Sequence, residues 1–183
     1  YAENPEKGFL PSIGTLRHMD VPKAVAFELG ADGVNPSAVR VDSGVREGDA
    51  ISPFYDPMIA KLIVWGADRT QALARMAQAL AEFRIVGLAT NIAFLKRLVE
   101  GEAFSSADLD TGLIERHGAT LFPPAAPAPL GALALAALAL SEAGQAANES
   151  DPWSRANGWR MNGDYRRVLS FSDEYSAGQE AGA

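Results

Sequence analysis

Three side chains in this sequence are of types that transfer protons in enzymes. Asp56 and Lys61 share one motif, YDPMIAK at residues 55–61, and either could serve as a general acid or base. His18 is the third candidate, as a general base. A structural interpretation competes in each case. Asp56 would pin the turn at Pro57, Lys61 would neutralise Asp56, and His18 would be a structural residue near strands. We favour the structural interpretation for all three.

Arg40 is a candidate of a different kind, because it would place a permanent positive charge on a predicted strand. Val39 and Val41 flank it, so strand alternation directs the guanidinium away from the core. The residues alone favour an ordinary surface arginine that is paired with Asp42 or Glu47.

Composition excludes several other kinds of chemistry. The sequence has no cysteine, which excludes disulfides, thiolate nucleophiles and cysteine-based metal sites. The two histidines are about a hundred residues apart and show no zinc spacing, so we expect no metal site. No GxGxxG or GxxxxGKS/T pattern occurs, so no loop here is predicted to hold ATP phosphates. A net charge of −7 without a basic cluster argues against nucleic acid as a partner.

Residues 39–62, VRVDSGVREGDAISPFYDPMIAKL, contain the elements that would position these side chains. The alternation at Val39–Val45 predicts a strand. Pro53 and Pro57 exclude a helix in the following loop. The apolar run Met58–Trp65 predicts a short buried strand. A polar loop held between two strands is a usual position for functional side chains.

The rest of the chain predicts mainly helices, because apolar residues recur at a spacing of three to four. The predicted helices are Asp68–Arg84, capped by Asp68; Asn91–Val99, capped by Thr90 and followed by Gly101; Thr111–His117, capped by Asp110 and followed by Gly118; and Leu130–Ala147. Further short strands are predicted at Ala24–Glu28, at Arg84–Val86, and as a hairpin within Trp159–Phe171. Residues 1–16 are interrupted too often by proline and glycine to form a long helix.

A proline- and alanine-rich stretch, residues 119–129, predicts a linker between two domains, 1–118 and 130–183. The apolar run Leu130–Leu140 is about half of the roughly 20 residues that a membrane span needs, so we predict a buried helix and no membrane. Tyr1 is not an initiator methionine, and no targeting signal opens the sequence, so we expect a piece of a longer polypeptide.

Several long motifs together give the chain a family resemblance. YAENPEKGFLPSIGTL (1–16), the stretch from Val39 through Arg69, ARMAQALAEFRIVGLATNIAFL (74–95) and DLDTGLIERH (108–117) occur in order and with natural spacing. In them the chain resembles the C-terminal lobe of the biotin carboxylase component of acyl-CoA carboxylases. The tail motif DPWSRANGWRMNG (151–163) resembles the α subunits of 3-methylcrotonyl-CoA carboxylases most.

The resemblance implies an α+β fold for residues 1–118, with a small antiparallel sheet and packed helices. It further implies a linker, then a helix and the first strands of a domain that bridges to the carboxyltransferase subunit. The implied reaction is ATP-dependent carboxylation of carrier-bound biotin by bicarbonate, for transfer to 3-methylcrotonyl-CoA or a similar acyl-CoA. In the family, the arginine at the position of Arg40 binds bicarbonate and steadies the ureido oxygen of biotin, which would make it the catalytic and cofactor-side residue here.

The same resemblance implies cofactors and partners. Biotin, ATP and Mg²⁺ would be held by parts that this chain lacks, so we expect the piece alone to be inactive. The implied partners are the carboxybiotin carrier and the carboxyltransferase β subunit. The implied location is the cytoplasm in a bacterium or the mitochondrial matrix in a eukaryote. The alternative from another class is a purely non-catalytic assembly module, which would have no reason to hold an arginine toward an active site.

Overall fold

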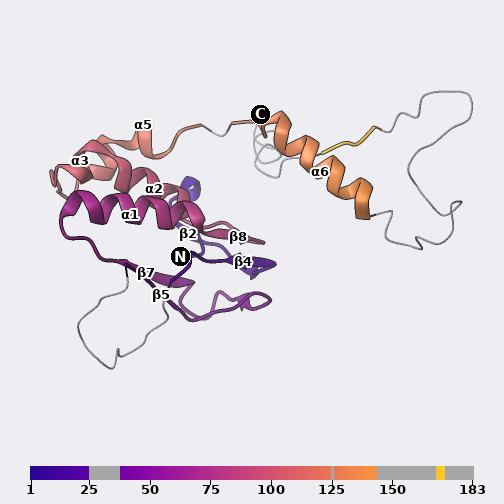
Figure 1. Cartoon of the computed structure of the whole chain (residues 1–183), viewed down its shortest axis with the longest axis horizontal. Helices are drawn as coiled ribbons and strands as arrows, with labels where there is room; N and C mark the ends of the chain where they lie inside the picture. Colours follow the sequence, from indigo (N-terminus) through magenta and orange to yellow (C-terminus); the bar gives the residue numbers. More distant parts are fainter. Residues whose placement is uncertain (25–37, 125, 144–167, 172–183) are drawn as a thin grey trace, which may run out of the picture. The chain divides into compact units, whose positions relative to one another are not determined.

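A computed structural model describes residues 1–24, 38–124, 126–143 and 168–171 (Figure 1). The chain divides into two compact units, Tyr1–Pro123 and Pro124–Ala183. Nearly all of the predicted strand at Ala24–Glu28 and most of the predicted hairpin at Trp159–Phe171 lie outside the described residues. The described part of the predicted hairpin, residues 168–171, forms no regular element.

The described strands of the first unit form four separate antiparallel pairs. They are β1 (Glu3–Asn4) with β2 (Leu10–Pro11), β3 (Gly14–Thr15) with β6 (Ala50–Ile51), β4 (His18–Asp20) with β8 (Arg84–Val86), and β5 (Val39–Ser43) with β7 (Ala60–Val64). A single 3-10 turn, η1 (Pro5–Lys7), separates β1 from β2. The sequence excludes a long helix in residues 1–16, and this stretch forms the short strands β1, β2 and β3 with the turn η1. Small antiparallel sheets with packed helices confirm the predicted α+β class.

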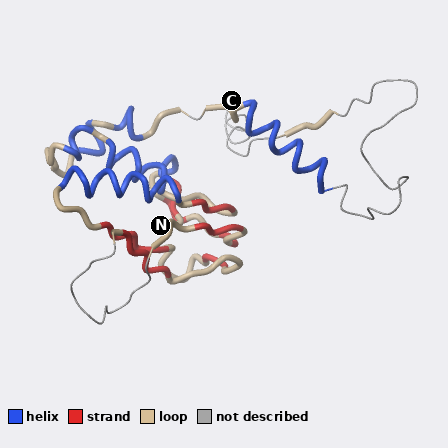
Figure 2. The backbone as a smooth tube through the Cα atoms, viewed as in Figure 1, coloured by secondary structure: helices blue, strands red, loops and turns tan. Residues whose placement is uncertain are grey.

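Helices cover one side of these strands, as Figure 2 shows for the first unit. The helices are α1 (Arg69–Glu82), α2 (Ile92–Glu100), α3 (Glu102–Ser105), α4 (Leu113–Arg116) and α5 (Gly118–Leu121). α1 packs against α2 and also contacts β7, so it joins the helical layer to the strand pair that carries Arg40.

The helix α1 begins where the sequence predicts. The Asp68 side chain accepts a hydrogen bond from the backbone N–H of Gln71 at 2.8 Å, which satisfies one of the free donors of the first turn. Leu80, which belongs to the predicted apolar face, is buried, and so is Ala79, which does not. The helix ends at Glu82, and the chain then turns extended at Phe83 into β8.

Two apolar clusters stabilise the first unit. One joins residues from the strand layer: Ala2, Leu16, Ile51 and Ile59 are buried there. The other joins the helices α2, α4 and α5 through the buried Phe94, Leu113 and Leu121, and Phe9 and Phe122 pack against it. Phe9 meets Phe94 edge-on, with ring centroids 4.9 Å apart, in one of the geometries that aromatic pairs prefer.

Gly87 allows two of the strand pairs to lie close together. Its φ is +115°, and a Cβ at this position would stand 2.1 Å from the carbonyl oxygen of Thr15. Just before it, the carbonyl of Val86 accepts a 2.8 Å hydrogen bond from the N–H of Arg17. Only glycine fits both the backbone conformation and the space.

Three local predictions are wrong. Thr90 does not cap α2; Asn91 occupies the cap position and makes no side-chain cap hydrogen bond. Gly118 does not end the helical part, because α5 begins there and continues to the buried Leu121, inside the stretch predicted as a linker. β7 is not buried on both faces, since burial alternates along it and leaves Lys61 and Ile63 exposed.

In the second unit the structure describes one helix, α6 (Leu130–Ala143), within the predicted range Leu130–Ala147. Its apolar residues surround the helix instead of forming a stripe, and four leucines are strongly exposed: Leu130, Leu135, Leu138 and Leu140. No helix within the described residues has the length and apolarity to cross a membrane.

Candidate functional site

The strand pair β5–β7 places Arg40 on the outer face of a small sheet. Val41 is buried, whereas Arg40 and Asp42 on either side of it point to the opposite face, as strand alternation requires. In the antiparallel register Arg40 stands across from Ile63, and Asp42 across from Lys61. The outer face therefore carries two cations, one carboxylate and one apolar side chain.

Arg40 and Asp42 form a two-pronged ion pair on this face. The Arg40 Nε donates to Asp42 Oδ1 at 2.9 Å, and Nη2 donates to Oδ2 at 2.7 Å. The side chains are 33% and 30% exposed, so water reaches both groups. Two parallel hydrogen bonds hold the planar guanidinium in the plane of the carboxylate. Of the two partners that the sequence offers Arg40, the structure selects Asp42.

The charges on this face favour an ionised Asp42. The hydrogen bonds from Arg40 hold the pKa of the Asp42 carboxyl below its usual value, against the opposing effect of desolvation. The positive charges of Arg40 and Lys61 add to this lowering. The hydrogen bond to Asp42 likewise raises the pKa of the Arg40 guanidinium, which stays charged at every physiological pH. The outer face of β5 and β7 therefore holds the Arg40 guanidinium in a fixed orientation and carries the Lys61 ammonium as a second positive charge.

The other candidates take structural positions. His18 Nδ1 lies 3.1 Å from Glu47 Oε2, and the same oxygen accepts a 3.0 Å hydrogen bond from the N–H of Met19. Glu47 therefore bridges to β4 and is not the partner of Arg40. Asp56 Oδ1 accepts a 2.9 Å hydrogen bond from the N–H of Met58, which pins the turn at Pro57 as predicted.

The predicted role of Lys61 is wrong. We expected it to neutralise Asp56, but the strand register places it across from Asp42, whose pKa its charge lowers. A residue's neighbour across a strand pair depends on register, which residue spacing along one strand does not give.

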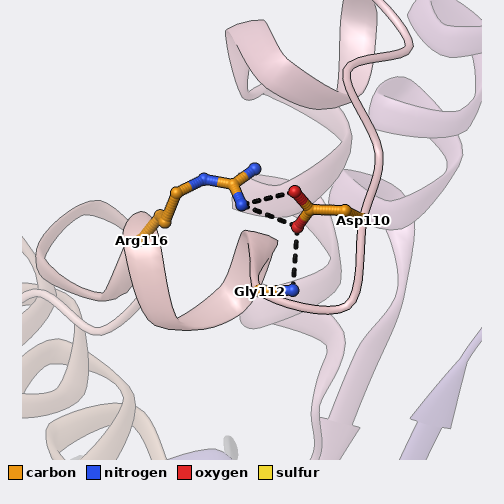
Figure 3. Close-up of polar contacts among 3 residues, drawn as sticks. All are labelled: Asp110, Gly112 and Arg116. Atoms are coloured by element: carbon orange, nitrogen blue, oxygen red, sulfur yellow. Dashed lines mark hydrogen bonds and ion pairs between the residues drawn. The ribbon is translucent and has the colours of Figure 1, made fainter.

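Two features of the described chain depart from the prediction. Asp110 was predicted to cap a helix that begins at Thr111, but Gly112 holds the N-cap position of α4, which begins at Leu113. Asp110 Oδ1 accepts a hydrogen bond from the N–H of Gly112 at 2.8 Å, and Arg116 Nη1 contacts both oxygens of the same carboxylate at 2.7 and 2.6 Å (Figure 3). The sequence Asp110-Thr111-Gly112 is the signal for the contact between Asp110 and Gly112, because it favours a turn closed by the aspartate side chain. The second feature is the loop before β7, where Phe54 and Tyr55 are 93% and 85% exposed.

An apolar pocket of about 280 Å³ lies elsewhere in the first unit, between α1, α2 and the strands β7 and β8. Leu62, Leu80, Ile85 and Leu95 are among its lining residues, and Arg40 is not. It offers no charged side chain for chemistry. Within the described residues, no group of three or more His, Asp or Glu side chains could hold a metal ion.

Comparisons with known proteins match both units. Residues 1–116 match the family model described as the biotin carboxylase C-terminal domain. The chain belongs to the biotin carboxylase C-terminal domain family. The matched range contains every described strand and therefore the outer face of β5 and β7, which carries Arg40. Residues 129–180 match a second model, the BT domain of the methylcrotonyl-CoA carboxylase α subunit.

Relatives of this family member are subunits of biotin-dependent carboxylases. The methylcrotonoyl-CoA carboxylase subunit alpha of Dictyostelium discoideum is 42% identical over 180 residues, which are 95% of this chain and 24% of the relative. The propionyl-CoA carboxylase alpha chain of Homo sapiens is 45% identical over 112 residues, 61% of this chain and 14% of the relative. This chain thus spans at most about a quarter of the length of these relatives.

Solved structures show the same fold. The biotin carboxylase domain of the Hydrogenobacter thermophilus 2-oxoglutarate carboxylase, a complex with MgADP, ADP and bicarbonate, has 34% identity and a TM-score of 0.57. It covers 66% of this chain, which corresponds to 24% of that chain. The urea carboxylase of Kluyveromyces lactis has 36% identity and a TM-score of 0.53, covering 63% of this chain and 9% of that chain.

Proposed function

We propose that this chain is part of the biotin carboxylase subunit of a biotin-dependent acyl-CoA carboxylase, and that Arg40 contributes to its active site. The observation that carries the proposal is the orientation of Arg40: a member of this family holds a fixed, planar guanidinium on the outer face of β5. The full subunit would carboxylate carrier-bound biotin with bicarbonate at the expense of ATP. The carboxyl group would then pass to 3-methylcrotonyl-CoA or a similar acyl-CoA.

The chemistry of Arg40 fits this role. Bicarbonate is a small planar oxyanion, and the ureido group of biotin is planar with one carbonyl oxygen. A guanidinium presents its donors in one plane and keeps its charge, so it suits both better than a lysine ammonium would. Biotin, when bound, supplies the ureido nitrogen that accepts the carboxyl group. Arg40 orients the two reactants and stabilises negative charge on the ureido oxygen.

ATP and Mg²⁺ belong to another part of the full subunit. The described residues contain neither a glycine-rich phosphate loop nor a group of acidic side chains that could hold a cation, so no ATP step is assigned to them. The Hydrogenobacter thermophilus biotin carboxylase domain is in complex with MgADP, ADP and bicarbonate, which supports ATP and bicarbonate as reactants of the full subunit.

A second role, assembly, is favoured for the C-terminal unit. Residues 129–180 match the BT domain of methylcrotonyl-CoA carboxylase α subunits, and α6 exposes four leucines. We propose that this unit contacts the carboxyltransferase β subunit. The mitochondrial relatives support a location in the mitochondrial matrix if the source is a eukaryote, and the bacterial equivalent is the cytoplasm.

The test is biotin carboxylation by the full-length subunit with Arg40→Met or Arg40→Lys. Loss of a positioned cationic donor at a developing oxyanion typically costs on the order of 10²–10³ in rate, and we expect that loss for Arg40→Met. Arg40→Lys restores the charge without the fork and should recover only part of the rate. The KM for ATP and the melting temperature should stay near the wild-type values. Near wild-type turnover of Arg40→Met, or a loss that unfolding explains, would refute the role of Arg40.

A further inference from the structure

We propose that Asp42 is a positioning residue for the carboxylation reaction, because its carboxylate fixes the plane in which the Arg40 guanidinium meets bicarbonate and the biotin carbonyl. The inference rests on the proposed function of Arg40. It adds a residue that the family resemblance does not point to, and it follows from the geometry of β5 and β7.

The strand itself brings the two side chains together. Residues two apart on a strand project from the same face, so Arg40 and Asp42 are neighbours as soon as β5 forms. The hydrogen bonds of 2.9 and 2.7 Å then join Nε and Nη2 to different carboxylate oxygens. One bond would leave the guanidinium free to rotate about that bond. Two bonds in one plane define the direction in which the whole group faces.

The strand is held in place from its other face and from its partner. Val41, between the two charged residues, is buried, and β5 is paired with β7 along its whole length. Ile63 stands directly across from Arg40 on the same face of the strand pair. Lys61 stands across from Asp42 and helps to keep the carboxylate ionised. Asp42, which orients Arg40, therefore stands on a strand whose own backbone is held in place.

A different role for the same contact would be inhibition. A carboxylate that merely occupies the guanidinium would compete with bicarbonate, and removing it would strengthen bicarbonate binding. Positioning predicts the opposite, because without the two hydrogen bonds to Asp42 the plane of the guanidinium is no longer fixed in the productive direction. Misplacement of a catalytic group by about 1 Å can cost 10²-fold in rate.

The experiment uses the full-length subunit and measures biotin carboxylation at varied bicarbonate and ATP, together with the melting temperature. Asp42→Asn keeps the size of the side chain but presents an NH₂ donor to a guanidinium donor, so it breaks the fork. We expect kcat to fall by about tenfold to a hundredfold, with an unchanged KM for ATP. Asp42→Glu keeps the charge and should recover part of the loss. Asp110→Asn is the matched control: it removes a second aspartate that is paired with an arginine, far from β5 in the sequence, and should leave kcat at the wild-type value.

The deciding variant combines Asp42→Asn with Arg40→Met. If Asp42 acts through Arg40, adding Asp42→Asn to Arg40→Met should change the rate by less than about twofold, since residues that act as a unit are strongly non-additive. Additive losses would overturn the inference, and so would wild-type kcat or a lowered KM for bicarbonate in Asp42→Asn. If Arg40→Met loses activity but Asp42→Asn does not, only the inference about Asp42 fails. If Arg40→Met itself stays active, the proposed function of Arg40 fails and this inference fails with it.

Discussion

Two arginine–aspartate pairs among the described residues of the first unit differ in what surrounds the carboxylate. In the strand pair, Arg40 uses two nitrogens to reach the two oxygens of Asp42. Near α4, a single nitrogen of Arg116 contacts both oxygens of Asp110, and one of these oxygens also accepts the N–H of Gly112. The exposed fractions of the side chains are lower in the strand pair, 33% and 30% against 45% and 55%.

The two pairs have different structural roles: one orients an arginine side chain, and the other stabilises a local backbone turn. Asp110 closes a backbone turn, and Arg116 on the next helix strengthens that closure, so this pair serves the entry into α4. Asp42 lies within a strand whose backbone is already paired with β7, so its carboxylate is not required to form the strand. What it does determine is the direction of Arg40. The same two residue types thus support a turn in one place and aim a cation in the other.

Exchanging the two residues of the strand pair gives the largest expected effect. Arg40→Asp combined with Asp42→Arg keeps the ion pair and the outer face of β5 but moves the guanidinium by two residues. The melting temperature of the full-length subunit should stay near wild type, because the charges still pair. The carboxylation rate should fall on the order of 10²–10³-fold, because the donors no longer face the developing charge.

The corresponding control is the exchange of Asp110 and Arg116. It should leave the rate unchanged and lower the melting temperature, because an arginine at 110 cannot accept the N–H of Gly112. If the variant with Arg40→Asp and Asp42→Arg kept full activity, only the net charge of the two residues would matter for the reaction, and the orientation of Arg40 would not.

The second prediction concerns the packing of the helical part. Leu121 is 3% exposed and packs in the cluster with Phe94 and Leu113. Leu121→Ala removes buried methyl groups, and such truncations typically cost about 2–5 kcal/mol of unfolding free energy. Ile63→Ala, at a residue that is 39% exposed, should cost much less. Urea unfolding of the full-length subunit and both variants measures the difference, and equal midpoints would place α5 outside the folded core.

The third prediction concerns pH and the turn at Asp110. Hydrogen bonds from Arg116, followed by that from Gly112, lower the pKa of the Asp110 carboxyl in the folded state. A lowered folded pKa stabilises the fold at pH values above the unfolded pKa of about 3.9, and this stabilisation is lost as pH falls through the folded value. Asp110→Asn should therefore lower the melting temperature at pH 7.

That difference should shrink below about pH 3.9, where the carboxyl of the unfolded chain begins to take up its proton while the folded one is still ionised. Melting curves of wild type and Asp110→Asn at stepped pH values between neutral and acid test the sign. A difference that grows on acidification would contradict the assignment of a lowered pKa to Asp110.

The smallest effect is expected at Lys61. Its ammonium stands across from Asp42 but is exposed, and exposed charges contribute little because water and salt screen them. Lys61→Met should lower the carboxylation rate by less than about fivefold, and added salt should reduce the difference from wild type further. A loss as large as that of Arg40→Met would mean that the reaction needs the charge of Lys61 as much as that of Arg40, and would contradict a minor role for Lys61.

Much of this protein follows from its sequence alone. The cap at Asp68 and the apolar residues of α1 depend on positions three to four apart, which local backbone geometry brings together in any context. The alternation that turns Arg40 away from the buried Val41 depends equally on the strand period. The motifs between Tyr1 and His117 were sufficient to indicate the family to which residues 1–116 belong.

The choice among partners was decided by the tertiary structure. Glu47 was as good a partner for Arg40 as Asp42 in the sequence, but the approach of β4 gives it His18 and the N–H of Met19 instead. Lys61 meets Asp42 because the register of β5 and β7 places it there. Such contacts join residues that lie far apart in the chain, and local propensity carries no information about which of them will meet.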